Sequence, residues 1–352
     1  MKNLTFIICS NGFGHYKRVN KVYKEIINKN LPIQINFICN KEKLEGFCRT
    51  FKTSFHDVNI HYELMKKEPN WIDPYKLSFK NYLSWFSRFK NNRIILDSDL
   101  IVSDNYLAPL SSGIKCILMG SFLWHEVIKS YNEETRSIYE NENKLIMDVK
   151  PKMIGLEYMA MNYIQTLTEF KKTNWFCEKK NNLDYNFKNN VLLTSGGTEH
   201  LDLVLLEIVR KLSKLDKSKN FYLDSKLYKK LNKKIENVFE FDFQESSFKM
   251  IDAIVCRPGI GILTDCISYN IPPIAIFNNS NIEIFKNAQK VHDKKLGFIF
   301  DVSNGLNNEI IKLVFNAMNS IENINKFKKN ISKEKLNGHK IAADIIINEL
   351  VQ

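Results

Sequence analysis

The chain has 352 residues, of which 44% are hydrophobic and 26% are charged, and its formal net charge is +12 at pH 7. These proportions are ordinary for a globular protein, and the length accommodates two domains of roughly 150 to 180 residues each. No apolar run approaches the roughly 18 to 20 residues of a membrane-spanning helix, and no secretory signal is recognisable, so we expect a cytoplasmic protein.

Short apolar segments alternate with helical patterns along the chain. Many of these segments are β-branched and do not alternate with polar residues, which is typical of parallel strands buried on both faces. The predicted strands are residues 4–9, 34–39, 100–103, 116–119, 190–194, 221–223, 237–241, 253–256 and 273–277, and the clearest helices are 17–28, 201–215, 262–269 and 285–294. The alternation predicts an α/β protein built from doubly wound, Rossmann-like sheets.

The series of strands is interrupted near the middle of the chain. Residues 132–189 are polar and helical in tendency, and a new strand-turn-helix unit then begins at residue 190. We therefore predict an N-terminal domain over residues 1–180 and a C-terminal domain over residues 181–352. The last helical pattern, residues 341–350, has no partner that the sequence identifies.

A glycine-rich turn follows the first predicted strand and contains Gly12, Gly14, His15 and Arg18. Glycines allow positive φ and let backbone N–H groups approach an anionic group closely. His15 lies at the start of the next helix, where the positive helix end disfavours imidazolium, so we expect a neutral ring that serves as a general base. The alternative is a structural turn with a histidine cap.

Asp104 follows the predicted strand at residues 100–103, at the carboxyl end where ligand-facing residues gather in open α/β sheets. If this strand neighbours the first one, Asp104 accepts a hydrogen bond from His15 and orients the ring. The alternative is that Asp104 caps a helix.

The C-terminal half carries two further turns of this kind. Ser195, Gly196, Gly197 and Thr198 offer hydroxyls and amides to a phosphate, although a plain turn is the alternative. Arg257, Gly259 and Gly261 form the second turn, directly after the strand at residues 253–256.

Three polar residues near these turns are candidates for binding a phosphate-linked ligand such as a nucleotide, through its ribose or through an attached sugar. Asp265 suits ribose hydroxyls, as acidic residues do in dinucleotide folds, unless it only complements the helix dipole. Glu283 and Asn287 suit sugar hydroxyls, unless they belong to an ordinary polar helix face.

An aromatic and basic segment spans residues 71–93. Residues of both kinds at helical spacing are able to lie on an anionic bilayer, or they form the packed side of an ordinary helix, which we slightly favour. The +12 charge has a similar ambiguity, because a composition rich in Lys, Asn and Ile produces it without a polyanionic partner. The lysine-rich helices lack the interleaved aromatics of a nucleic-acid site, so no nucleic-acid partner is expected.

These motifs resemble those of GT-B glycosyltransferases. The stretch from Arg257 and Gly259 through Asp265 to Glu283 and Asn287 resembles the donor-binding region of the UDP-N-acetylglucosamine transferase of peptidoglycan synthesis, and Phe241 lies where that family contacts uracil. The N-terminal turn is more similar to the GxGHxxR motif of the pseudaminic-acid-pathway UDP-sugar hydrolase, which uses the motif's histidine, here His15, in catalysis. The departures are Asp265 in place of a glutamate, Phe277 in place of a proline, and no evident Gln-Gln pair before Asn287.

The resemblance implies two Rossmann-like domains that face each other across a cleft, an acceptor domain followed by a donor domain. The expected activity is inverting transfer of a sugar from a UDP-linked donor to an acceptor hydroxyl, on a lipid or cell-surface glycan of the envelope. We expect His15 as the base, Asp104 as its orienting partner, and Arg18 as a charge facing the diphosphate. No metal is expected, because helix dipoles and amides are able to neutralise the leaving group and the seven scattered cysteines form no CxxC pair. Hydrolysis of the UDP-sugar and a non-catalytic sugar-nucleotide-binding role stay open, as does peripheral contact with the inner face of the membrane.

Overall fold

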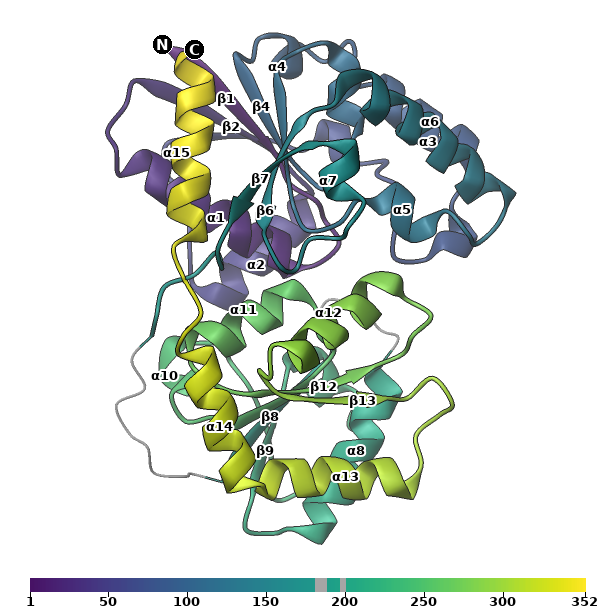
Figure 1. Cartoon of the computed structure of the whole chain (residues 1–352), viewed down its shortest axis with the longest axis vertical. Coiled ribbons are helices and arrows are strands. Elements are labelled where there is room, and N and C mark those ends of the chain that lie inside the picture. Colours follow the sequence, from purple (N-terminus) through teal and green to yellow (C-terminus); the bar gives the residue numbers. More distant parts are fainter. Residues whose placement is uncertain (181–188, 197–200) are drawn as a thin grey trace. The chain divides into compact units, whose positions relative to one another are not determined.

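The computed structural model of the chain (Figure 1) describes residues 1–180, 189–196 and 201–352. The chain divides into two compact units, the first made of Met1–Phe176 together with Asn337–Gln352 and the second of Cys177–Leu336. Among the described residues, no helix combines the length and the apolar character needed to cross a bilayer.

The first unit is built on a seven-stranded parallel sheet in the order β3-β2-β1-β4-β5-β6-β7. Helices connect successive strands, as parallel pairing requires. Because the order reverses between β1 and β4, the loops after these two strands flank the switch point of the sheet, where ligands bind in open α/β folds. The elements are β1 (Lys2–Ile7), α1 (Phe13–Ile27), β2 (Ile33–Ile38), α2 (Lys41–Phe51), β3 (Val58–His61), α3 (Phe79–Ser87), α4 (Arg93–Leu96), β4 (Leu100–Asp104), β5 (Cys116–Met119), α5 (Trp124–Ile128), α6 (Glu133–Val149), β6 (Lys152–Leu156), α7 (Ile164–Leu167), β7 (Glu169–Thr173) and α15 (Gly338–Val351).

The second unit repeats this plan with a six-stranded parallel sheet in the order β10-β9-β8-β11-β12-β13. Its switch point lies between β8 and β11. The elements are β8 (Asn190–Thr194), α8 (Asp202–Leu215), β9 (Asn220–Leu223), α9 (Ser225–Lys229), β10 (Val238–Glu240), α10 (Glu245–Phe248), β11 (Ala253–Cys256), α11 (Ile260–Ser268), β12 (Pro273–Phe277), α12 (Ile282–Asp293), β13 (Phe298–Asp301), α13 (Asn308–Asn319) and α14 (Ile321–Ile331). The predicted α/β class with two doubly wound sheets is confirmed.

All nine predicted strands are present within a few residues, but four further strands were missed. Three of these, β3, β7 and β13, lie at sheet edges, and the sequence of β7 (EFKKT) is polar because one side of an edge strand meets solvent. The prediction that residues 132–189 lack strands was wrong, since both β6 and β7 lie there.

The C-terminal helix α15 belongs to the first unit, although the predicted second domain ran to residue 352. Its apolar side packs against α1, where Ala342, Ala343 and Ile346 are fully buried in the core around β1 and β2. Glu349 on α15 forms ion pairs with Lys115, directly before β5, and with Lys152, the first residue of β6. The predicted boundary after residue 180 lies four residues beyond Phe176, the last residue of the first segment of this unit.

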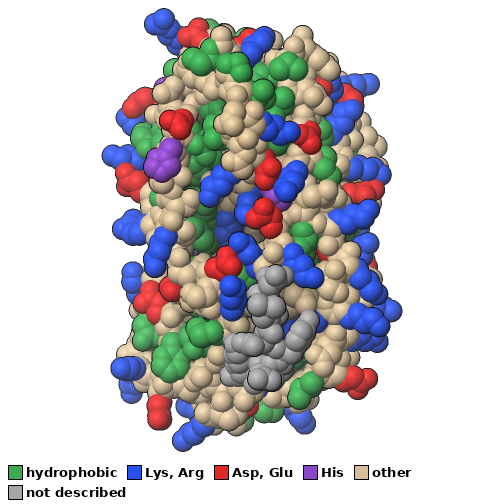
Figure 2. Space-filling model, turned by 90° about the vertical axis from the view of Figure 1, so that its left-hand side faces the viewer, with side chains coloured by type: hydrophobic (Ala, Val, Ile, Leu, Met, Phe, Trp, Pro, Cys, Tyr) green, Lys and Arg blue, Asp and Glu red, His purple; other side chains and the backbone are tan. Residues whose placement is uncertain are grey.

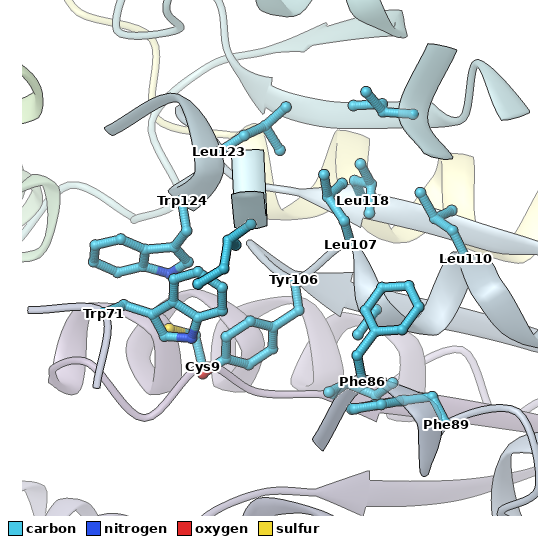
Figure 3. Close-up of a cluster of buried hydrophobic side chains, with 14 of the residues drawn as sticks. Cys9, Trp71, Phe86, Phe89, Tyr106, Leu107, Leu110, Leu118, Leu123 and Trp124 are labelled. Carbon is cyan, nitrogen blue, oxygen red and sulfur yellow. The ribbon is translucent and has the colours of Figure 1, made fainter. Parts of the chain in front are cut away.

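The aromatic segment at residues 71–93 is part of the core of the first unit. Trp71 is stacked on Trp124 with ring centroids 6.1 Å apart and lies beside Tyr106 (Figure 3). Trp71 also contacts Trp85 edge-on. Phe86 and Phe89 are buried in the same cluster, whereas Tyr75 is 72% exposed. The interpretation as the packed side of a helix is therefore confirmed for Phe86 on α3, whereas Trp71 and Phe89 are buried outside that helix. None of these buried side chains is available to a bilayer.

Basic side chains are scattered over the face shown in Figure 2, with acidic side chains between them. Elsewhere in the described chain, exposed lysines pair with a glutamate one helical turn away, such as Lys211 with Glu207 and Lys249 with Glu245.

Candidate functional site

The first unit brings His15 and Asp104 into direct contact. Strands β1 and β4 are neighbours, with Ile7 opposite Ser103, so the loop after β1 and the end of β4 meet at the switch point. The Nδ1 atom of His15 lies 2.5 Å from Oδ1 of Asp104, and this carboxylate is fully buried. Nδ1 therefore carries the proton that Asp104 accepts. The arrangement agrees with the predicted pair and not with a capping role for either residue.

Arg18 also binds Asp104 rather than standing free. Its Nε and Nη2 donate to the two carboxylate oxygens at 3.0 and 2.7 Å, and Nη2 also lies 3.3 Å from the side-chain oxygen of Asn105. A two-pronged arginine–carboxylate pair is strong and fixes the plane of the carboxylate. Asp104 thus compensates the charge of Arg18, which was predicted to face a diphosphate. His15 and Arg18 reach the same carboxylate because Arg18 lies one helical turn after His15 on the same face of α1.

The charges of this cluster decide its protonation. Burial of Asp104 raises its pKa, but Arg18 and His15 outweigh that effect and hold the pKa below its usual value, so the group is a carboxylate at neutral pH. Burial lowers the pKa of His15, but the neighbouring Cys9 and Asp104 outweigh it and raise the pKa to about 10. The expectation of a neutral His15 was wrong, because Cys9 and Asp104 together outweigh the effects that favour the neutral ring.

Gly12 fixes the turn that leads into this site. Its φ of 121° is accessible to glycine and strained for other residues, and α1 begins directly after it at Phe13. Phe13 packs edge-on against Phe47 and Phe51, which anchors the turn to α2. Gly14 is in the first turn of α1, next to His15.

In the second unit, the turn after β8 is organised by Asp224. The carboxylate of Asp224 accepts hydrogen bonds from the Thr194 hydroxyl at 2.8 Å and from the Ser195 N–H at 3.3 Å, and it also caps α9 through Leu227. The N–H of Gly196 points back to the Thr194 hydroxyl. A phosphate would therefore have to displace these bonds or use other donors. Gly197 and Thr198, the rest of the predicted cradle, lie outside the described residues.

Asp224 was not predicted from the sequence. The available signal was its place directly after strand β9, where an aspartate both ends a strand and caps a helix. Burial raises its pKa, although its three hydrogen-bonded donors and Lys226 oppose that shift.

The turn after β11 lies beside the turn after β8, because Cys256 pairs with Thr194. Helix α11 begins at Gly259, which has no side chain to cap the first N–H groups, and Gly261 lies within the first turn. Asp265 is half-buried in the second turn of α11. It is therefore too far from the N-terminus of the helix for the alternative role, which was to complement the helix dipole there.

Glu283 and Asn287 form a polar pair on α12. Asn287 donates to Glu283 at 3.3 Å, and both side chains are nearly buried, Glu283 in the first turn of the helix and Asn287 in the second. Burial lowers the pKa of Arg257, and the charge of Glu283 opposes that shift. An arginine remains charged near neutrality even so. The alternative, an ordinary polar helix face, does not fit two side chains that are nearly buried, whereas the binding of sugar hydroxyls by Glu283 and Asn287 stays a prediction.

Phe241 does not present its ring to a ligand. The side chain is 3% exposed and packs edge-on against Phe243 and Phe248 at 5.1 Å each. Only its backbone is available for the predicted contact with a base.

Residues 195–344, somewhat less than half of the chain, match the glycosyltransferase family 28 C-terminal domain. No curated protein matches the sequence significantly.

Solved structures match over the full length. They include the glycosyltransferase VinC in complex with dTDP (TM-score 0.60, 12% identity, 100% of both chains) and Acinetobacter baumannii MurG (TM-score 0.61, 11% identity, 99% of this chain and 100% of that one). Arabidopsis thaliana UGT89C1 complexed with UDP-L-rhamnose matches with a TM-score of 0.62 and 10% identity over 99% of each chain.

The chain has the GT-B fold, with two Rossmann-like units. The matched domain together with this fold supports a glycosyltransferase that uses a nucleotide sugar.

Proposed function

We propose that this chain is an inverting, metal-independent glycosyltransferase that moves a sugar from a UDP-linked donor to an acceptor hydroxyl. The observation that carries the proposal is the His15–Asp104 pair at the switch point of the first sheet, in a chain whose second unit matches a glycosyltransferase domain. In this proposal the first unit activates the acceptor and the second unit holds the donor.

His15 acts through the nitrogen that faces away from Asp104. Nδ1–H donates to Asp104, so the other ring nitrogen, Nε2, takes the proton of the acceptor hydroxyl. The acceptor oxygen forms a bond to the anomeric carbon while the bond from that carbon to the phosphate oxygen breaks, and the electron pair leaves with UDP. Attack opposite the leaving group inverts the anomeric carbon. Arg18 keeps Asp104 ionised, which stabilises the imidazolium that forms.

The leaving diphosphate is assigned to the second unit. The start of α11 at Gly259 supplies backbone N–H groups, and Arg257 supplies a positive charge. Donors fixed before the reaction stabilise developing charge without a metal ion. Asp265, Glu283 and Asn287 remain our candidates for the ribose and the sugar.

The raised pKa of His15 has a kinetic consequence. With a pKa of about 10, roughly one molecule in a thousand carries a neutral ring at pH 7 before substrates bind. A general base must be neutral to accept a proton, so kcat/KM should rise about tenfold per pH unit between pH 6 and 9. A rate that is constant or falls over this range would remove His15 from the role of base.

UDP-sugar hydrolysis is the second candidate, and the GxGHxxR-like turn containing Gly12, Gly14, His15 and Arg18 favours it. The same base would then activate water. Release of UDP from a UDP-sugar without any acceptor, at the same rate as with an acceptor mixture, would establish hydrolysis. A non-catalytic binding role would follow if nucleotide sugars bound to the protein but no donor was turned over.

The donor site is tested by thermal unfolding against a panel of nucleotides and nucleotide sugars. A ligand at about 100 times its Kd adds roughly 2.7 kcal/mol to the stability of the unit that binds it. We expect UDP or a UDP-sugar to raise the Tm, Asp265→Ala to abolish the shift, and Asp293→Ala, an exposed change on α12, to leave it intact. No shift with any nucleotide would contradict the proposed donor site.

A further inference from the structure

A carboxylate outside the predicted site closes a ring of hydrogen bonds beside His15. Glu68 follows β3 in the chain and accepts a hydrogen bond from the Ser10 hydroxyl at 2.5 Å on Oε2 and one from the Tyr106 hydroxyl on Oε1. The N–H of Ser10 donates in turn to the Tyr106 hydroxyl at 3.2 Å. Three separate segments, which follow β1, β3 and β4, are therefore joined through one carboxylate.

This ring holds the backbone that delivers His15. Ser10 begins the turn, its carbonyl accepts the N–H of Gly12 at 2.9 Å, and Gly12 adopts the φ of 121° that redirects the chain into α1. Tyr106 is fixed independently, because its ring packs between Trp71 and Trp85 in the core. The ring of hydrogen bonds among Glu68, Ser10 and Tyr106 therefore restrains the turn that leads to His15.

The carboxylate also acts on His15 electrically. Burial raises the pKa of Glu68 to about 7, while hydrogen bonds from Ser10 and the charges of His15 and Lys43 oppose the rise. The titratable groups that face it are His15 and Tyr16 on α1, Lys43 on α2, and Tyr106. The charges of Glu68 and His15 thus interact, and Glu68 is charged at alkaline pH, where His15 loses its proton.

We propose that Glu68 is a positioning residue of the His15 site, which fixes the Ser10–Gly12 turn through Ser10 and Tyr106 and favours the protonated imidazole. The catalytic consequence of this inference rests on the proposed function, but the positioning itself does not. No other residue of the segment after β3 has this relation to His15 among the contacts that the structure describes.

The test is a direct titration of His15 by NMR of histidine-labelled protein from pH 6 to 10.5, with the signal assigned by its loss in His15→Gln. Glu68→Gln keeps the size of the side chain and removes the charge, so the midpoint of His15 should fall by about 0.5 to 1 unit, less than for a close ion pair. Glu63→Gln, an exposed change on the same segment, should leave the midpoint unchanged. An unchanged midpoint in a Glu68→Gln protein with native circular dichroism would overturn the inference.

A second measurement separates positioning from charge. Tyr106→Phe removes only the hydroxyl of the ring, so it leaves the core packing in place. If the hydrogen bonds of Glu68 and Tyr106 act as one unit, the double variant Glu68→Gln/Tyr106→Phe should reduce kcat by less than the product of the two single reductions. The KM for the donor should be unchanged. Strictly multiplicative effects would contradict a shared role. If no transfer or hydrolysis is found at all, the NMR result still decides the inference, so the two failures are distinguishable.

Discussion

Because His15 is protonated in the folded protein, the stability of the first unit should fall as the pH rises through the alkaline range. The folded pKa of His15 is raised to about 10, against an ordinary value of 6.5. A group whose pKa is raised on folding stabilises the protein fully below the unfolded pKa, and this stabilisation is lost as the pH rises through the folded pKa. The window for the loss is therefore from pH 6.5 to about 10.

The size of the effect follows from the two pKa values. Linkage gives a contribution of about 3.3 kcal/mol at pH 7.5 and about 0.8 kcal/mol at pH 9.5, so about 2.5 kcal/mol is lost between them. The side chain of His15 is only 11% exposed, so solvent weakly screens its ion pair with Asp104. Replacing His15 with Gln should remove this part of the pH dependence while the pair between Arg18 and Asp104 persists.

The assay is urea unfolding at pH 7.5 and 9.5, followed by tryptophan fluorescence. The chain has four tryptophans, Trp71, Trp85, Trp124 and Trp175, and all of them lie in the first unit, so the signal reports that unit alone. We expect the difference in unfolding free energy between wild type and His15→Gln to shrink by about 2.5 kcal/mol from pH 7.5 to pH 9.5. His292→Gln, an exposed change in the second unit, should track the wild type. Equal differences at the two pH values would refute the assignment of a charged His15.

Three further predictions concern the same unit. Asp104→Asn leaves Arg18 without its buried partner, so we expect a loss of about 3 to 5 kcal/mol in urea unfolding and a fall in kcat. Gly12→Ala should lower stability by about 1 to 3 kcal/mol because of its φ of 121°, whereas Gly46→Ala in the interior of α2 should be tolerated, and equal effects would argue against strain at Gly12. Burial raises the pKa of Glu142 to about 8, so the stability tied to its protonated form is lost as the pH rises through 8. Glu142→Gln should therefore gain stability relative to wild type between pH 7 and 9.5, and a constant difference would contradict this.

The strands of the sheet centres and the turns that follow them could be predicted from the sequence. Apolar runs such as Ala253–Cys256 have few uses other than a buried parallel strand, and a glycine such as Gly12 directly after one marks a tight turn. Because functional loops lie at the carboxyl ends of such strands, the contact between His15 and Asp104 could be predicted from the glycine-rich turn and the end of a neighbouring strand. That inference needed no knowledge of side-chain partners.

The partners and the charges of these residues depend on the folded chain. Arg18 pairs with Asp104, 86 residues away, and Glu68 reaches Ser10 across 58 residues, which no local pattern encodes. The charge on His15 likewise depends on Cys9 and on the distant Asp104, which its own helix does not supply. The edge strand β7 and the place of α15 escaped prediction for the same physical reason: local sequence specifies which residues prefer burial, whereas the folded chain decides which surface buries them.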